Sequence, residues 1–370
     1  MKRMNYLAIA MLGMMSGSVL AATGNSLKVL TDSELSAETG QALFNMSYIG
    51  PGGTNPNVDT GFYKLGMEAQ LDLNANIKKL QLGCGGVKGA GCDIDLDNVS
   101  FTGIVPTGNM AGGTDAGPAS DFTLINPFYE IAIKNPTSAS TRELVGFKIG
   151  ADSIWGMLSI GSPPTDGRDA NVAANHTGIN SISGHMPTII NNGIVPTTIC
   201  SILTGGANDP VGCNGLTLST TNSTINVNDP NTGDNRFDLI MQRSSRVELN
   251  GIKVKSLLDL TINANLDQDL RFIHNITAGS DPNGNRKYDP GESVDNFGIS
   301  VQGQDVMWNT NGKWLNAQKG WWMELPESKI ENFTTRRVYT TLGAIFGLDL
   351  KDLNQNQFPV DNCYGGLTFC

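Results

Sequence analysis

The chain has 370 residues, a formal net charge of −10 and 44 glycines. The negative charge argues against a protein that binds nucleic acid, because the phosphates would be repelled. The content of Gly, Asn, Thr and Ser predicts many strands joined by tight turns, so we expect an all-β fold.

The N-terminus has the parts of a secretory signal peptide. Lys2 and Arg3 are basic, Tyr6–Met15 is a short apolar run, and Val19–Ala21 resembles a cleavage site. We therefore expect a signal peptide over 1–21 and export to the cell surface, an extracellular fibre or the periplasm. Neither this run nor any later stretch is long enough for a stable span, so the sequence predicts no transmembrane segment.

Composition divides the rest of the chain into four segments. We expect a helical turn and a strand over 22–61, a first β block over 62–161, a loop-rich excursion over 162–238, and a second β block over 239–370. Thr31 and Glu34 form a capping box that predicts one or two helical turns near the mature N-terminus. The alternation that follows predicts a strand within Gln41–Ile49.

The first β block begins with a long alternation of apolar and polar residues. Leu65–Ile77 has period 2 throughout, which is typical of a half-buried antiparallel strand. The phase changes at Lys78–Lys79, which predicts a bulge or bend. Further strands are expected over Phe122–Lys134 and Leu144–Ile160.

The second β block repeats this pattern. Asn250–Gly251 predicts a two-residue hairpin turn, and Leu258–Asp267 alternates again. Together the patterns predict long antiparallel amphipathic strands in an elongated sandwich- or solenoid-like body. Long Gly/Asn/Thr-rich loops would join these strands.

The six cysteines fall in three local pairs. An even number of cysteines in an exported chain predicts disulfides, although the sequence does not fix their connectivity. Pairing between neighbours is the simplest expectation, and a zinc site is disfavoured because no C-x-x-C occurs. The neighbouring pairs are Cys84 and Cys92, Cys200 and Cys213, and Cys363 and Cys370.

Several phrases of the chain resemble the FilA-type pilus assembly proteins of Gram-negative bacteria. The opening Leu30–Gln41, of the form L-(S/T)-D-x-E-L-S-x-x-T-G-Q, carries the resemblance together with later phrases. These are Leu71–Asn74, Leu80–Gly86, Asn126–Phe128, Ser140–Glu143 and Gly320–Met323. The resemblance implies involvement in a surface fibre and no defined chemistry.

The sharpest chemical signal is an oxygen-rich loop, Asp281–Glu292. Numbered from Asp281, it offers oxygens at the ligand positions of a 12-residue calcium loop. Arg286 departs from the motif, because Gly is expected at that place. We predict a weak Ca²⁺ site, and the alternative is a turn that merely uses Asn, Gly and Pro. The candidate ligands are Asp281, Asn283, Asn285, Lys287, Asp289 and Glu292.

No catalytic motif is found in the sequence. The Gly-x-Ser-x-Gly and His-Glu-x-x-His patterns are absent, and we interpret His176 and His185 as loop residues. The aspartates Asp93, Asp95 and Asp97 are interpreted as a solvated strand face, with a metal site as the alternative. Trp308, Trp314, Trp321 and Trp322 fit a core or a subunit interface better than a glycan platform.

We therefore expect a non-catalytic, exported structural protein of the cell surface that takes part in pilus or fibre assembly. Its partners would be other fibre subunits and outer-membrane assembly machinery. Strand addition is the expected mode, with Gln41–Ile49 as donor and Phe44, Met46 and Tyr48 as inserted side chains. Two alternatives stay open: a calcium-stabilised adhesin or glycan-binding module, and a secreted hydrolase with an unrecognised site.

Overall fold

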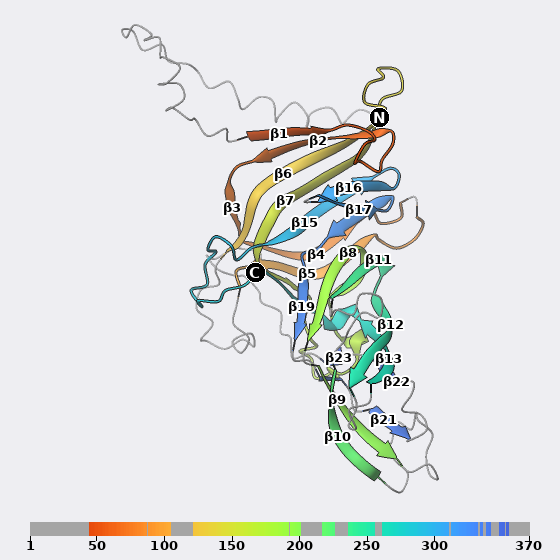
Figure 1. Ribbon diagram of the computed structural model, residues 1–370. Helices are drawn as coiled ribbons and strands as arrows, with labels where there is room; N and C mark the ends of the chain where they lie inside the picture. Colours follow the sequence, from red (N-terminus) through yellow and green to blue (C-terminus); the bar gives the residue numbers. More distant parts are fainter. Residues whose placement is uncertain are drawn as a thin grey trace. The chain divides into compact units, whose positions relative to one another are not determined.

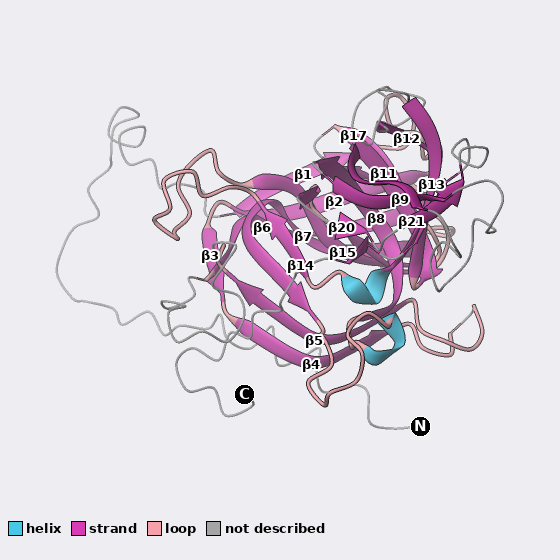
Figure 2. Cartoon of the chain, turned by 90° about the horizontal axis from the view of Figure 1, so that it is seen from below, coloured by secondary structure: helices cyan, strands magenta, loops and turns pink. Residues whose placement is uncertain are grey.

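The described part of the chain is built almost entirely of strands. The computed structural model describes residues 44–86, 88–104, 121–191, 193–200, 217–225, 236–255, 261–310, 312–331, 334–335, 338–341, 348–351 and 353–354, all within the unit Leu43–Cys370. Helix is limited among these residues to two 3-10 turns, η2 (Ala173–Asn175) and η3 (Leu270–Phe272) (Figure 2). The all-β expectation is confirmed. The predicted signal peptide and helical turn lie outside the described residues.

The largest sheet contains 13 strands in the described residues, with the central order β1-β2-β6-β7-β15-β18-β8-β5-β4 (Figure 1). Most neighbours are antiparallel, while β18 and β19 run parallel to β8. Its strands are β1 (Phe44–Ile49), β2 (Thr60–Met67), β3 (Gln70–Leu73), β4 (Ala75–Leu82), β5 (Ile94–Thr102), β6 (Phe122–Lys134), β7 (Glu143–Ile160), β8 (Ile179–Asn191), β11 (Arg236–Ser244), β14 (Asn275–Ala278), β15 (Val294–Gln302), β18 (Gly320–Glu324) and β19 (Ser328–Glu331).

Three smaller sheets complete the described strands. One contains β9 (Gly193–Cys200), β10 (Thr217–Ile225), β20 (Thr334–Thr335), β21 (Val338–Thr341) and β23 (Leu353–Asn354). Another contains β12 (Arg246–Lys255), β13 (Thr261–Asp269) and β22 (Leu348–Lys351). The third is the hairpin of β16 (Val306–Thr310) and β17 (Lys313–Ala317).

The main core is enclosed by a ring of pairings within the largest sheet. Because β7 is long, its C-terminal part pairs with β5 while its earlier part pairs with β15, and the pairings β15–β18, β18–β8 and β8–β5 complete the ring. Apolar side chains from these strands pack together, including Ile94, Leu96, Leu158, Ile179 and Met323. Burial of such side chains is the dominant favourable contribution to folding.

The alternating stretch Leu65–Leu82 forms parts of three strands rather than one. β2 and β3 both pair with β6, and the chain then passes to β4, which pairs with β5. Lys78 and Lys79 are both exposed, and Asn98 on β5 has φ +46°. The register of β4 with β5 does not shift at Lys78–Lys79, so no bulge occurs in this pair, and the change of phase appears only as a local bend. The alternation did not reveal the change of partner, because a strand keeps period 2 whichever neighbour it has.

Two segments differ from their sequence-based interpretation. β8 lies in the segment expected to be loop-rich, yet it is a buried strand of the main sheet. Since Ile182–Thr188 is buried without a break, no alternation marks it.

The predicted hairpin turn at Asn250–Gly251 is wrong: β12 continues through it, with a register shift between Leu249 and Ile252. Gly251 has φ +74°, so the positive φ serves a bulge instead of a turn.

A second, smaller core lies between the β16–β17 hairpin and one face of the main sheet. Phe62, Ala132 and Trp322 from the sheet contact Trp308 and Ala317 from the hairpin. The rings of Phe62 and Trp308 meet edge to face with centroids 5.4 Å apart. We call the sheet face under this hairpin the inner face, and the opposite face of β1, β2, β6 and the first half of β7 the outer face.

Candidate functional site

The edge strand β1 is the first feature with functional potential. Among the described residues β1 pairs only with β2, so its other edge has no partner strand. Phe44 is 51% exposed, Met46 78% and Tyr48 49%. The strand expected within Gln41–Ile49 is thus confirmed over Phe44–Ile49, and its three large apolar side chains are exposed to solvent.

These side chains continue across the outer face of the sheet. The register aligns Tyr48 with Tyr63, Ile131 and Phe147 in one row. The next row aligns Met46, Leu65, Tyr129 and Ile149. Large apolar side chains on this face that are exposed are Met46, Tyr48, Tyr63, Tyr129, Leu144, Phe147 and Ile149.

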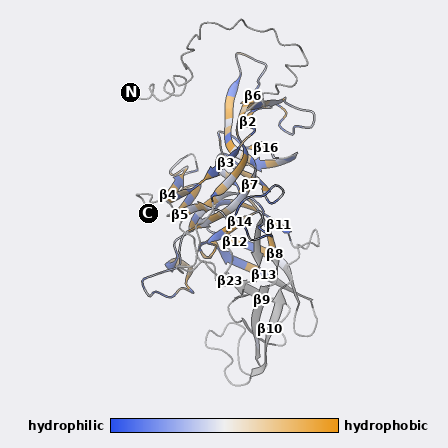
Figure 3. Cartoon of the chain, turned by 90° about the vertical axis from the view of Figure 1, so that its left-hand side faces the viewer, coloured by the Kyte–Doolittle hydropathy of each residue, from blue (hydrophilic) through white to orange (hydrophobic). Residues whose placement is uncertain are grey.

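Ring contacts hold part of the outer face together. The Tyr48 and Tyr63 rings have centroids 4.5 Å apart, and the Tyr129 and Phe147 rings stack at 6.3 Å. The face is therefore an ordered apolar patch beside an open sheet edge. Figure 3 shows the alternation along β2 and β6 as bands of hydrophilic and hydrophobic residues.

The inner face of the same strands carries charged residues. Glu130 on β6 lies directly opposite Lys148 on β7, and Lys148 lies opposite Ser300 on β15. The Lys148 Nζ atom is 2.6 Å from the Glu324 Oε2 atom on β18. Burial raises the pKa of the Glu130 carboxyl to about 7, against the opposing effect of the Lys148 and Lys64 charges. Motif reading missed this group. In the sequence, each of these charged residues stands alone among apolar or glycine neighbours.

The acidic loop connects β14 to β15. The Asp281 carboxylate accepts the N–H groups of Asn285 and Arg286 at 3.1 and 3.0 Å. The amides of Asn283 and Asn285 both donate to Asp289 Oδ2, at 2.8 and 2.7 Å. Three predicted ligands therefore converge on one point. A half-turn of either amide would present its oxygen there instead, but it would break the bond that the oxygen now accepts from the backbone N–H of Asn285 or Lys287.

The remaining predicted ligands close the loop. Glu292 is buried, and its Oε2 atom accepts the Asp289 N–H at 3.0 Å. Lys287 donates its N–H to Asn285 Oδ1 at 2.8 Å. At the neck, the Ser280 N–H donates to the Glu292 carbonyl at 3.0 Å, and Trp155 donates to the Ser280 carbonyl at 2.8 Å.

Arg286 adopts the conformation for which the calcium motif uses Gly. Its φ is +59°, so the sharp turn forms despite the side chain. A non-Gly residue in this region bears a modest conformational cost. No group of three or more His, Cys, Asp or Glu side chains arranged for a metal occurs in the described ranges.

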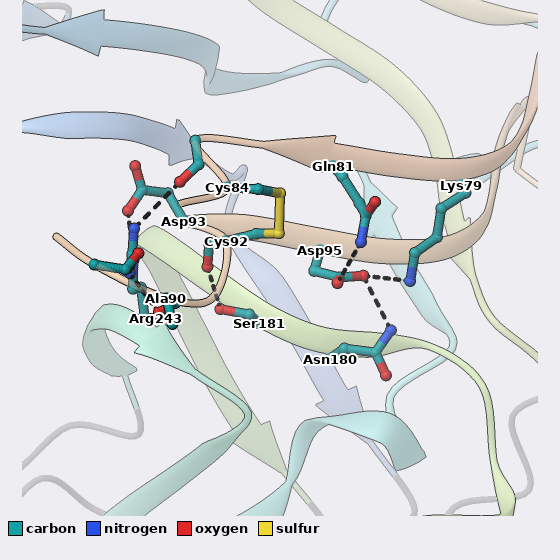
Figure 4. The surroundings of a disulfide bond; sticks show 12 residues. Lys79, Gln81, Cys84, Ala90, Cys92, Asp93, Asp95, Asn180, Ser181 and Arg243 are labelled. Carbon is teal, nitrogen blue, oxygen red and sulfur yellow. Dashed lines mark hydrogen bonds and ion pairs between the residues drawn. A yellow bond between two sulfur atoms is a disulfide. The ribbon is translucent and has the colours of Figure 1, made fainter. Parts of the chain in front are cut away.

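The Cys84–Cys92 disulfide is confirmed, and a partly buried ion pair supports its loop (Figure 4). Arg243 from β11 donates to Asp93 at 2.8 Å and to the carbonyls of Gly83 and Ala90 at 3.2 and 3.0 Å. Arg243 thus fixes the disulfide loop to the sheet. Cys200 ends β9, while Cys213, Cys363 and Cys370 lie outside the described residues.

The aspartates of β5 and its flank contact cations and amides of the protein. Besides the Asp93–Arg243 pair, Lys79 lies 2.8 Å from Asp97, and it also contacts Asp95. Asn180 donates to Asp97 at 2.6 Å. The interpretation of a solvated strand face is therefore wrong for Asp93, which is buried, while Asp95 and Asp97 are partly exposed.

The histidines belong to structured parts of the chain. His176 Nδ1 lies 3.1 Å from His274 Nε2, and His274 Nδ1 lies 3.0 Å from the Ile160 carbonyl. Burial lowers the pKa of His274 to about 4. His185 is buried on β8, with Nε2 3.4 Å from Asp238. Trp308 and Trp322 are buried, so the four tryptophans do not form an exposed platform.

Comparisons with protein-family models, curated proteins and solved structures give no match. No helix in the described ranges has the length and apolar character of a membrane span.

Proposed function

We propose that this protein is a non-catalytic, exported structural protein of the cell surface that assembles into a pilus or fibre through its β1 edge. The observation that carries the proposal is the open β1 strand, with Phe44, Met46 and Tyr48 exposed. An unpaired edge presents N–H and C=O groups to another chain, and apolar side chains beside it add burial when a strand docks.

The outer face strengthens this proposal. Soluble proteins usually protect an edge strand with charges, Pro or a covering element. On β1 the large exposed side chains are apolar, alternating with exposed Asn45 and Ser47, and they continue into Tyr63, Tyr129 and Phe147. A partner strand or a second copy would bury this patch. The resemblance to FilA-type pilus assembly proteins and the N-terminal signal pattern support the same reading.

The donor-strand hypothesis takes a specific form here. β1 already pairs with β2 of its own chain over Phe44–Ile49. In a fibre, β1 would exchange onto the β2 of a neighbouring copy, or its open edge would accept a strand of that copy. Other fibre subunits and outer-membrane assembly machinery are the proposed partners.

The test compares two exposed apolar residues. Met46→Lys places a charge on the open edge, and Val58→Lys places one on an exposed residue in a turn outside the sheet. We expect sheared cell-surface material to contain the wild type and Val58→Lys in high-mass form, whereas Met46→Lys yields subunits or short fibres. A high-mass fraction unaffected by Met46→Lys, with unchanged filaments in a deletion strain, would refute the assembly role.

The acidic loop supports a second candidate function, a calcium-stabilised adhesin. The side chains of Asn283 and Asn285 gather around Asp289 through their NH2 groups, so a Ca²⁺ site there requires both amides to turn and present their oxygens. Asp281 and Glu292 would complete it, with Kd on the order of 10⁻⁴ to 10⁻³ M as in extracellular modules. Arg286 weakens the site because it adds positive charge nearby.

Calorimetry of the full chain with CaCl₂ tests this site. Asp281→Ala and Glu292→Ala should each remove the heat of binding. Asp166→Ala removes an exposed carboxylate from a different loop, where it pairs with Arg168, and serves as the matched control. Absence of heat at millimolar Ca²⁺ would show that the loop is only a structural turn. A glycan array then separates an adhesin from a fibre subunit.

A further inference from the structure

The inner face brings a lysine and two glutamates together under the β16–β17 hairpin. Lys148 lies on β7, Glu130 on β6 and Glu324 on β18, so β15 separates Lys148 from Glu324. The Lys148 side chain crosses β15 over Gly298, where a Cβ atom would lie 3.0 Å from Lys148 Cε. Glycine at that position therefore allows Lys148 to reach Glu324, at 2.6 Å.

This group is closed to solvent. The side chains of Lys148 and Glu324 are 1% and 2% exposed. Thr310 of the hairpin accepts from Lys148 at 3.1 Å and donates to Glu324 Oε2 at 3.0 Å. The Trp308 ring lies 5.9 Å from Lys148 Nζ. The surroundings are a hydroxyl, an indole and backbone, with solvent largely excluded.

The hydrogen bonding of the carboxylates is incomplete. Within the described residues, Glu324 Oε1 and Glu130 Oε2 are buried without a hydrogen-bond partner. A buried ion pair offsets its desolvation only when the remaining lone pairs are satisfied. The arrangement therefore keeps two charges in a dry site without the bonds that would stabilise them fully.

We propose that Lys148 and Glu324 condense to an intramolecular amide cross-link between β7 and β18. The Lys148 ammonium first loses a proton, and its lone pair then attacks Cδ of Glu324. The N–C bond forms, one carboxyl oxygen leaves as water, and a neutral amide remains. An ammonium and a carboxylate give an amide and one water molecule, so the step needs neither oxidant nor reductant.

Three physical effects favour this reaction. The amine and the carboxyl are held near the distance of reacting atoms, which replaces a bimolecular encounter. Exclusion of water removes the solvation that normally stabilises the two ions and opposes condensation. The product carries no charge, so the cost of burying an ion pair disappears.

Glu130 is placed to carry the proton. It lies directly opposite Lys148, and the Lys148, Lys64 and Glu324 charges all act on it. Its pKa near 7 allows it to accept the ammonium proton, while the Thr310 hydroxyl, bonded to both Lys148 Nζ and Glu324 Oε2, passes a proton to the departing oxygen. We assign it the proton-transfer role in the condensation.

Lys64 and Asp152 provide an internal comparison. Their atoms are 2.7 Å apart, on β2 and β7, but the side chains are 32% and 39% exposed. Water solvates this carboxylate, so it should remain an ion pair. Distance alone is similar in the two pairs, and burial is the difference.

The cross-link is tested on the full exported chain, reduced and denatured. Its intact mass should be lower than the mass of its own sequence by one water molecule. A tryptic digest should contain a branched peptide that joins Lys148 to Glu324, without cleavage after Lys148. An intact mass equal to the sequence value, with linear peptides ending at Lys148, would overturn the proposal.

Three variants separate the roles. Lys148→Arg keeps a cation but lacks the amine, so the mass deficit should vanish, whereas Lys64→Arg should retain it. Glu130→Gln should slow cross-linking and change its pH profile, measured by mass against time as chain produced in the unfolded state, before any amide has formed, is folded. If the mass deficit persists in Lys148→Arg, the cross-link joins another pair of residues. If the rate of cross-linking is unchanged in Glu130→Gln, Glu130 does not transfer the proton. The proposal does not depend on fibre assembly, because the cross-link is detected from the mass of the isolated chain.

Discussion

The two faces of β6 and β7 invert the usual distribution of residues. On the inner face, Glu130 and Lys148 are buried; on the outer face, Tyr129 and Ile149 are exposed. These residues are sequence neighbours, so a single alternation of the strand separates them. Adjacent positions of one strand thus present charge to the interior and hydrocarbon to solvent.

The difference indicates two kinds of function in one sheet. A buried charge costs free energy unless it is paired, so its presence points to a chemical or specifying role. An exposed apolar patch points to an interaction surface. The buried charges of the inner face point to a role within the chain. The exposed apolar side chains of the outer face point to contact with another molecule.

The largest expected effect on stability comes from removing one partner of the buried Lys148–Glu324 pair on the inner face. Lys148→Met leaves the Glu324 carboxylate buried with neither its cation nor the proposed amide, and should lower the free energy of unfolding by about 3–5 kcal/mol. The double variant Lys148→Met/Glu324→Leu removes both charges and should recover much of this loss. Urea denaturation measures each step.

Lys64→Met is the control for this experiment. Its partner Asp152 is partly exposed, so the expected loss is below about 1 kcal/mol. If Lys148→Met loses no more than Lys64→Met, burial does not set the cost of unpairing these two inner-face lysines.

The pH dependence of stability isolates Glu130. Burial raises its pKa from 4.5 to about 7, so its contribution to stability is complete below about pH 4.5 and is lost as pH rises toward 7. The loss amounts to roughly 3 kcal/mol. Glu130→Gln should abolish this part of the slope in urea denaturation repeated across the pH range.

His274 has the opposite sign and requires its own titration. Its pKa is lowered from 6.5 to about 4, so its contribution is present above about pH 6.5 and is lost as pH falls toward 4. The two slopes partly cancel in the wild type. His274→Asn should therefore expose the Glu130 slope, and an unchanged curve in both variants would contradict these assignments.

The glycines of the inner face provide a smaller effect. A Cβ atom at Gly146 would lie 2.8 Å from Trp308 Cζ2, so Gly146→Ala should lower the free energy of unfolding by about 1–3 kcal/mol through overpacking. At Gly303 the nearest atom would be 3.9 Å away. Gly303→Ala should therefore be near neutral in the same denaturation experiment, and equal losses would argue against close packing under the hairpin.

Alternation predicted the strands of the first β block but not which face would be buried. Phe122–Lys134 was predicted with the bounds of β6, and Leu144–Ile160 nearly with those of β7. In β7, alternation alone would turn Lys148 outward and its neighbours Phe147 and Ile149 inward. The structure has the reverse, because the glycines of the inner face and the distant hairpin make room for Lys148.

Strand partners and distant contacts were equally hidden. β8 is buried on both sides, so it gives no alternation, and Asn250–Gly251 has the composition of a hairpin turn although it forms a bulge. The Cys84–Cys92 disulfide was predicted because its partners are close in sequence. The Lys148–Glu324 contact joins residues far apart in the chain, and no local pattern indicates it.

The smallest expected change in stability belongs to the outer face. Ile149 is 52% exposed, so Ile149→Thr should alter the free energy of unfolding by no more than about 0.5 kcal/mol. Thr keeps a β-branched side chain and so preserves the strand preference. The same variant should weaken self-association, measured by sedimentation, because it removes apolar area from the proposed contact.

Ile154→Thr on the same strand sharpens this last test. Ile154 is 1% exposed, so the identical substitution places a hydroxyl in the core and should cost about 1–3 kcal/mol. If Ile149→Thr destabilises the isolated subunit as much as Ile154→Thr, the outer face is already covered within the chain. If only self-association changes, the apolar rows of β1, β2, β6 and β7 act between chains, and the sheet keeps its structural and its assembly roles on opposite faces.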